Sequence, residues 1–105
     1  MLQRKYTKEA YEEFHVAIAN DDLEKVKELV EQDKVAITNI ECIKVVRLNR
    51  LLLLKYFLAK STNLIGALAY ALDEAVRQKN YEAISLLVTY FRDNKERYVH
   101  SDLSF

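Results

Sequence analysis

The chain has 105 residues, half of them hydrophobic and 30% charged, which is the balance of one folded domain and not of a disordered chain. It contains no proline and a single glycine, Gly66, so tight hairpins and glycine-rich loops are disfavoured and we expect an all-α fold. Sixteen basic and sixteen acidic residues cancel, which argues against a general electrostatic attraction to nucleic acid or membranes.

The first two predicted helices form a pair near the N-terminus. Thr7 can cap a helix that runs to about Asn20. Asp21 and Asp22 then interrupt the apolar pattern, and Glu24 follows Asp21 at the spacing of a capping box. The next helix covers residues 23–32 and is apolar on one face only, so it must pack against another element.

The middle pair is predicted from about Asn39 to Leu58. It follows a connector, DKVAI, and a second capping box made by Thr38 and Glu41. Its second helix is apolar on nearly every side, which is typical of a helix packed between neighbours. The residues that make it so are Leu51, Leu52, Leu53, Leu54, Phe57 and Leu58.

The third predicted pair begins after a cap formed by residues 61–63. A long helix runs from Leu64 to Gln78, Lys79 and Asn80 turn the chain, and a last helix covers Tyr81 to about Arg92. Residues 94–105 form a polar tail with at most one further helical turn.

The three pairs repeat one apolar pattern, about 29 residues apart. Apolar residues recur at i, i+3 and i+4 and, after a polar break, at i, i+3, i+6 and i+7, as in two short amphipathic helices joined by a turn. We predict one domain over 1–105, a solenoid of about three stacked helix-turn-helix repeats at about 8–36, 37–61 and 62–93. The matching positions, which we expect to form the core, are Phe14, Cys42 and Leu72; Ala17, Val45 and Ala75; Ile18, Val46 and Val76; Leu23, Leu51 and Tyr81; Val26, Leu54 and Ile84; Leu29, Phe57 and Leu87; and Val30, Leu58 and Val88.

The first segment, FHVAIANDDLEKVKELVE, resembles the ankyrin repeat, whose unit reads roughly T-P-L-H-x-A-A and then G-H-L-E-x-V-x-x-L-L. The opening Thr-Pro is missing, Asp21, Asn49 and Lys79 replace the loop glycines, and the period is shorter than the usual 33 residues. The resemblance implies helical repeats that bind proteins, with the β-hairpins between repeats shortened or absent. Tetratricopeptide repeats and a plain six-helix bundle are the alternatives.

No catalytic, metal or cofactor site is predicted, so we expect neither an enzyme nor a small-molecule substrate. His15 lies where the resemblance implies a structural histidine, and His100 lies in the tail. A phosphate loop needs more than one glycine. The paired acids at 12–13, 21–22 and 73–74 fit helix starts and solvated faces.

The sequence favours a cytoplasmic protein. Cys42 is the only cysteine and cannot form an internal disulfide, as expected in a reducing compartment. The N-terminal residues are polar and do not resemble a signal peptide. The leucine run at 51–54 is too short to span a bilayer, so no membrane contact is expected.

The resemblance implies a partner-binding face formed by first-helix ends and loop edges. Arginine suits both carboxylate recognition and interface hot spots. We therefore expect a non-enzymatic protein–protein interaction module, an adaptor or inhibitor, whose protein partner lays an acidic segment across the arginines. The candidate residues are Asn20, Asp22, Arg47, Arg50, Arg77, Gln78 and Asn80.

Other interpretations remain open. The arginines can instead pair with the chain's own acids, such as Asp73. Residues 41–60 carry five basic and one acidic group, so the middle repeat could bind nucleic acid, although zero net charge disfavours this. A self-associating structural domain is the third class, and we expect a monomer or weak dimer. Small degenerate ankyrin proteins occur in large DNA viruses and intracellular bacteria, so the resemblance also admits a host-directed role.

Overall fold

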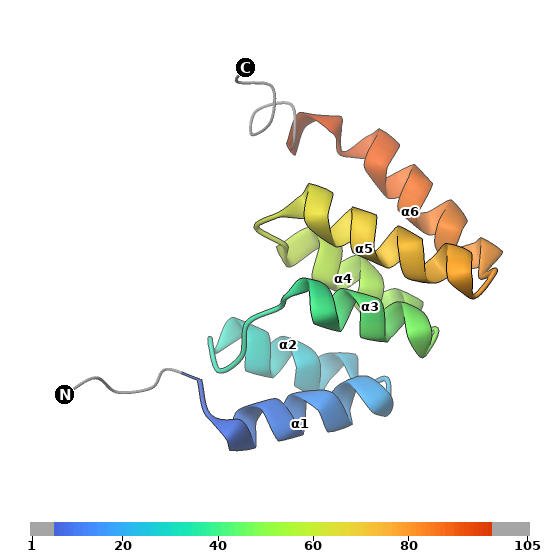
Figure 1. The fold of residues 1–105 in the computed structure, drawn as a ribbon. Coiled ribbons are helices and arrows are strands. Elements are labelled where there is room, and N and C mark those ends of the chain that lie inside the picture. The colour runs from blue at the N-terminus through green and yellow to red at the C-terminus, as the bar shows by residue number, and fades with distance from the viewer. Residues whose placement is uncertain (1–5, 98–105) are drawn as a thin grey trace. The chain divides into compact units, whose positions relative to one another are not determined.

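A computed structural model describes residues 6–97 of the chain. Residues 95–97 add a helical turn after the six main helices, and no strand occurs within 6–97, so the prediction of an all-α fold is confirmed. The six helices are α1 (Lys8–Ala19), α2 (Leu23–Glu31), α3 (Asn39–Arg47), α4 (Leu51–Lys60), α5 (Leu64–Arg77) and α6 (Tyr81–Asp93) (Figure 1).

The chain divides into two compact units, residues 1–37 with α1 and α2, and residues 38–105 with α3 to α6. Within the second unit, α5 packs against both α3 and α4, and α6 packs against α5. The division coincides, to within a residue, with the predicted boundary between the first and second repeats. That the whole of 1–105 acts as one domain stays a prediction.

One turn geometry joins the two helices of each pair. Asp21, Asn49 and Lys79 all have a left-handed backbone, with φ of 56°, 59° and 54°. These residues lie 28 and 30 apart, the same shifts as the apolar pattern, so the same turn geometry recurs at the spacing of that pattern. Each turn is closed by the 6→1 hydrogen bond of a Schellman motif. The bonds run from Asp22 N to Ala17 O (2.8 Å), from Arg50 N to Val45 O (2.7 Å) and from Asn80 N to Ala75 O (2.9 Å).

Glycine usually occupies such left-handed positions because it has no Cβ. Here aspartate, asparagine and lysine occupy them, and Asp33 (φ 58°) ends α2 in the same way. Gly66 lies instead in the first turn of α5. A Cβ at Gly66 would come 2.7 Å from Nδ2 of Asn63, and Oδ1 of Asn63 accepts the hydrogen bond from Gly66 N that caps the helix. The only glycine therefore makes room for a cap.

The other helix starts follow the predicted caps with one correction. Thr7 Oγ1 accepts from Ala10 N at 3.1 Å, and Thr38 and Glu41 form the predicted capping box. The cap of α2 is Asp22, which accepts from Lys25 N, and the prediction of Asp21 was wrong. The physical reason is that Asp21 takes the left-handed conformation that ends α1, so the cap position before α2 passes to the next residue.

Most of the repeated apolar positions are buried in the first two helix pairs. In α4, however, the prediction that nearly every side is covered was wrong at Leu52, which is 63% exposed. The fully buried residues of the two pairs include Phe14, Ile18, Val26, Val45, Val46, Leu53, Leu54, Phe57 and Leu58.

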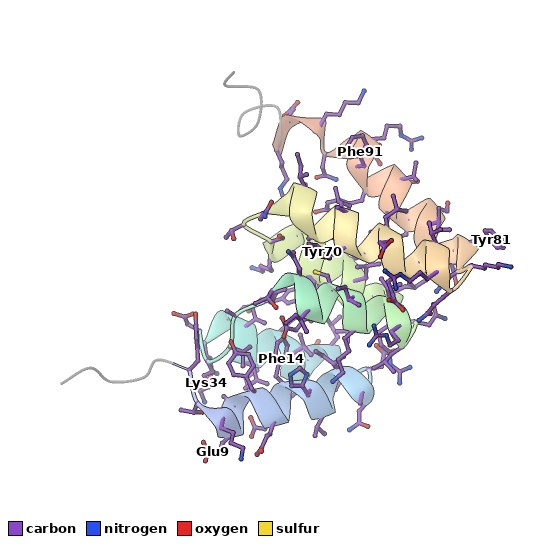
Figure 2. The ribbon with its side chains drawn as sticks, in the orientation of Figure 1. Glu9, Phe14, Lys34, Tyr70, Tyr81 and Phe91 are labelled. Atoms are coloured by element: carbon purple, nitrogen blue, oxygen red, sulfur yellow. The ribbon has the colours of Figure 1, made fainter. Side chains whose placement is uncertain are left out.

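The third helix pair departs from this pattern. Its repeat positions Leu72, Val76, Tyr81 and Val88 are 36%, 56%, 73% and 52% exposed, so the prediction that they belong to the core was wrong. The reason is that α5 covers α3 and α4 with its opposite face, and none of the described elements of this unit covers the outer side of α5 and α6. Tyr81 projects outward at the start of α6 (Figure 2).

Candidate functional site

The structure brings the predicted binding residues of the second unit to one edge, where α3 and α5 end side by side. Asn80 Nδ2 donates to Asn49 Oδ1 at 2.9 Å, which ties the turn after α3 to the turn after α5. Asn20 and Asp22 occupy the equivalent turn of the first unit. The residues at the α3–α5 edge are Arg47, Arg50, Arg77, Gln78 and Asn80.

Arg47 already holds an acid of its own chain. Its Nε and Nη2 donate to the carboxylate of Glu74, both at 3.4 Å, and Gln78 Nε2 donates to the same carboxylate at 2.7 Å. The Glu74 side chain is only 12% exposed, so its charge needs these partners. The Arg47 guanidinium, with help from Gln78, holds the pKa of Glu74 below its ordinary value, against burial, which acts to raise it. Arg47 thus ties α3 to α5.

Replacing Glu74 by glutamine should lower the free energy of unfolding at pH 7 by about 1 kcal/mol, the net value of a typical hydrogen bond. The lowered pKa of Glu74 means that its ionised form favours the folded state, so its contribution is present above the ordinary carboxyl pKa of 4.5 and is lost as the pH decreases below it. Urea unfolding of both proteins from pH 3 to pH 7 measures this difference. Glu96→Gln, at an exposed position after α6, is the matched control, and its effect on the free energy of unfolding should not change between pH 3 and pH 7.

Arg77 also pairs within the chain, but at the surface. Its Nη2 and Nε donate to Oδ2 of Asp73 at 2.8 and 3.0 Å, and the two side chains are 71% and 62% exposed. An exposed pair of this kind contributes about 0–1 kcal/mol, so a partner's carboxylate can replace Asp73 at little cost. The alternative of internal pairing therefore holds for Arg47 and Arg77, and of the two, Arg77 is the one that can exchange its partner.

An apolar groove of about 320 Å³ lies between α5 and α6. Every side chain that lines it is apolar, and Phe91, at the far end of α6, is half exposed (Figure 2). The sequence analysis did not identify this groove, because it assigned Leu72 and Val88 to the core. No signal in the sequence distinguished these positions, because the apolar pattern of the third pair is the same as that of the first two. Six of the lining residues are Ile65, Leu68, Leu72, Leu87, Val88 and Phe91.

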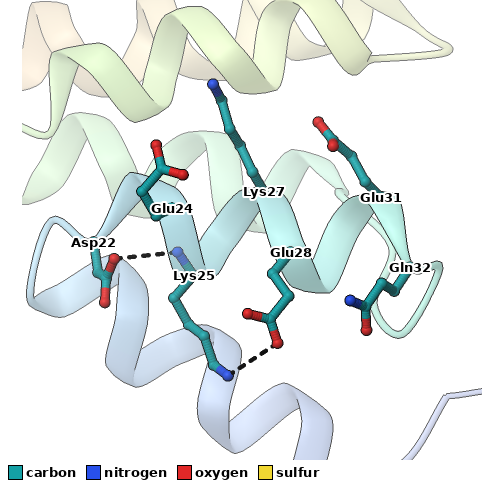
Figure 3. A pocket seen from close by; sticks show the side chains of 7 residues that line it. All are labelled: Asp22, Glu24, Lys25, Lys27, Glu28, Glu31 and Gln32. Atoms are coloured by element: carbon teal, nitrogen blue, oxygen red, sulfur yellow. Dashed lines mark hydrogen bonds and ion pairs between the residues drawn. The ribbon is translucent and has the colours of Figure 1, made fainter.

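A second hollow, of about 610 Å³, lies beside α2 and is lined by charged and polar side chains (Figure 3). Lys25 Nζ donates to Glu28 at 3.3 Å, and this bond, with Glu13 nearby, raises the pKa of Lys25 above its ordinary value. Asp22 is engaged in capping α2. These contacts are typical of a solvated helix face. The side chains that line the hollow do not converge as those of a catalytic site would.

Cys42 lies in the core, and its burial, with Glu41 beside it, raises the pKa of the thiol to about 12. We expect the folded protein to react with Ellman's reagent at pH 8 at least about 100-fold more slowly than the unfolded chain, because the thiolate is the reactive form. The absorbance at 412 nm with and without 6 M guanidinium measures the two rates. Equal rates would place Cys42 at the surface.

Chemistry elsewhere in the described residues is sparse. His15 is half buried, with its ring centroid 6.0 Å from that of Phe14. Within 6–97, no three His, Cys, Asp or Glu side chains lie together as metal ligands would. None of the helices in that range has the length and apolar character that a membrane span requires. His100 lies outside the described residues.

No protein-family model matches the chain, and neither the curated proteins nor the solved structures contain a match.

Proposed function

We propose that this chain is a protein-binding module whose binding surface is the apolar groove between α5 and α6. One observation carries the proposal: Leu72 and Val88 line an open groove, whereas the residues 30 positions earlier, Cys42 and Leu58, are buried. Large exposed apolar surfaces with polar rims are typical of protein-interaction sites. Asp73, which follows the lining residue Leu72 in the sequence, forms an exposed ion pair with Arg77.

A protein fits this surface better than a small molecule does. Sites for small ligands combine apolar walls with a few convergent polar groups, and all of the side chains that line this groove are apolar. The groove is also open along α5 and α6, and half-exposed residues such as Phe91 and Val88 stand on it. Partially exposed aromatic and aliphatic residues of this kind anchor protein interfaces.

We also propose that the chain forms an ankyrin-like solenoid of three repeats and acts in the cytoplasm as a non-enzymatic adaptor or inhibitor. The recurrence of one turn geometry at Asp21, Asn49 and Lys79 supports the repeats, and the free thiol of Cys42 supports a reducing compartment. The α3–α5 edge, with Arg47, Arg50 and Arg77, remains a second candidate surface for an acidic segment of a partner. The exposed and exchangeable pair of Arg77 with Asp73 favours it.

Val88→Lys should abolish capture of the protein partner without unfolding the chain. Val88 is 52% exposed, so lysine can reach solvent and the free energy of unfolding should change by less than about 0.5 kcal/mol. Affinity capture from lysate, with mass spectrometry of the retained proteins, measures the loss. Val16→Lys is the matched control, because Val16 is a 59% exposed valine on α1, outside the groove. Identical sets of retained proteins for the two variants would exclude the groove as the binding surface.

A further inference from the structure

The second unit contains an example of how such a groove is filled. The helix α5 packs against both α3 and α4, so a single helix covers the groove between the two helices of a pair. On α5, the side chains turned inward include the buried alanines Ala67 and Ala71. Small residues of this kind let the backbones of two helices approach closely. The occupant of the α3–α4 groove is therefore an amphipathic helix with small and apolar residues on one face.

A charged contact fixes the position and direction of that helix. Arg47 in the last turn of α3 binds Glu74 in the last turns of α5, and Gln78 supports the same carboxylate. The two helices end at one edge, where Asn49 and Asn80 are hydrogen-bonded, so α3 and α5 run parallel (Figure 1).

The open α5–α6 groove repeats these features 30 residues later in the sequence. Leu72 and Val88 line the open groove and are exposed, whereas Cys42 and Leu58, 30 positions earlier, are buried. Arg77 occupies the position of Arg47, at the C-terminal end of the first helix. The open groove thus has the apolar rows and the terminal arginine of the filled one, and no helix among the described residues of this unit fills it.

We propose that the α5–α6 groove binds one amphipathic α-helix of another protein, in the way that α5 binds the α3–α4 groove. The bound helix runs parallel to α5, presents small and apolar residues to the groove, and carries a carboxylate near its C-terminal end that pairs with Arg77. Asp73 gives up Arg77 readily because their ion pair is exposed. This inference rests on the proposed function and specifies the class of partner.

The α5 sequence itself supplies the probe. A fluorescent peptide of residues 61–79, held helical by a hydrocarbon bridge in place of Ala69 and Asp73, keeps its inner face because both replaced residues are exposed. We expect saturable binding to the full chain by fluorescence anisotropy. The variant Val88→Lys of the chain should lose this binding, and Val16→Lys should keep it. Glu74→Gln in the peptide should weaken binding about three- to tenfold, the effect of losing one charged contact.

A charge exchange tests the pairing with Arg77. The chain variant Arg77→Glu should bind the original peptide more weakly and should regain affinity for the peptide with Glu74→Arg. If Val88→Lys abolishes binding but no charge change affects it, the carboxylate and its pairing are refuted while the protein-binding function stands. If the peptide does not bind at all, the proposal that the groove binds a helix is refuted, and the capture experiment then tests the protein-binding function independently.

A second copy of the chain is the competing occupant. Sedimentation velocity over a range of concentrations should show a monomer for the wild type. A dimer that Val88→Lys dissociates, and Val16→Lys does not, would overturn the proposal.

Discussion

Replacing Leu54 by alanine should lower the free energy of unfolding by about 2–5 kcal/mol, the range for removing a large buried side chain. Leu54 is fully buried in α4, a helix that packs against α3 and α5, so the substitution leaves a cavity that the surrounding helices can close only in part. Urea unfolding followed by circular dichroism at 222 nm measures the loss. If the free energy of unfolding keeps the same dependence on urea concentration, the substitution has changed stability alone.

The same helix provides a matched control for this prediction. Leu52→Ala makes the identical chemical change two residues earlier, at a side chain that is 63% exposed, and should change stability by no more than about 0.5 kcal/mol. Equal losses at the two positions would mean that α4 does not present the face that the structure assigns to the core.

Replacing Phe14 by alanine should cost about 3–5 kcal/mol within the first unit. Phe14 is fully buried on α1, and its ring lies edge-on to that of Tyr11, with centroids 6.2 Å apart, a geometry that adds to the effect of burial alone. Hydrogen exchange of the amides of α1 and α2, read by mass spectrometry, should increase strongly. Val16→Ala, on the exposed side of the same helix, should leave exchange nearly unchanged. Unaltered protection in α1 and α2 after loss of Phe14 would contradict its place in the core.

Local sequence signals predicted the helices well because the interactions that define them are local. Thr38 and Glu41 form their capping box within one turn, and Asn63 caps α5 within three residues. The α2 cap was misplaced by one position, because Asp21 and Asp22 are chemically identical and only the left-handed backbone of Asp21 distinguishes them.

The candidate site was less predictable, because its parts come together over long sequence distances. Arg47 and Glu74 are 27 residues apart, and no local pattern distinguishes this structural arginine from the exchangeable Arg77. The apolar pattern likewise gave Val46 and Val76 the same expected burial, although one is covered and the other is not.

The sequence by itself determined the helices, their caps except that of α2, the positions of the three turns and the apolar face of each helix, because propensity, capping and periodicity act within a few residues. Tertiary structure alone decided which of those apolar faces are covered and which arginine pairs with a buried carboxylate. Burial depends on whether another element packs over a face, and the pattern on α5 and α6 is the same whether or not a helix lies there.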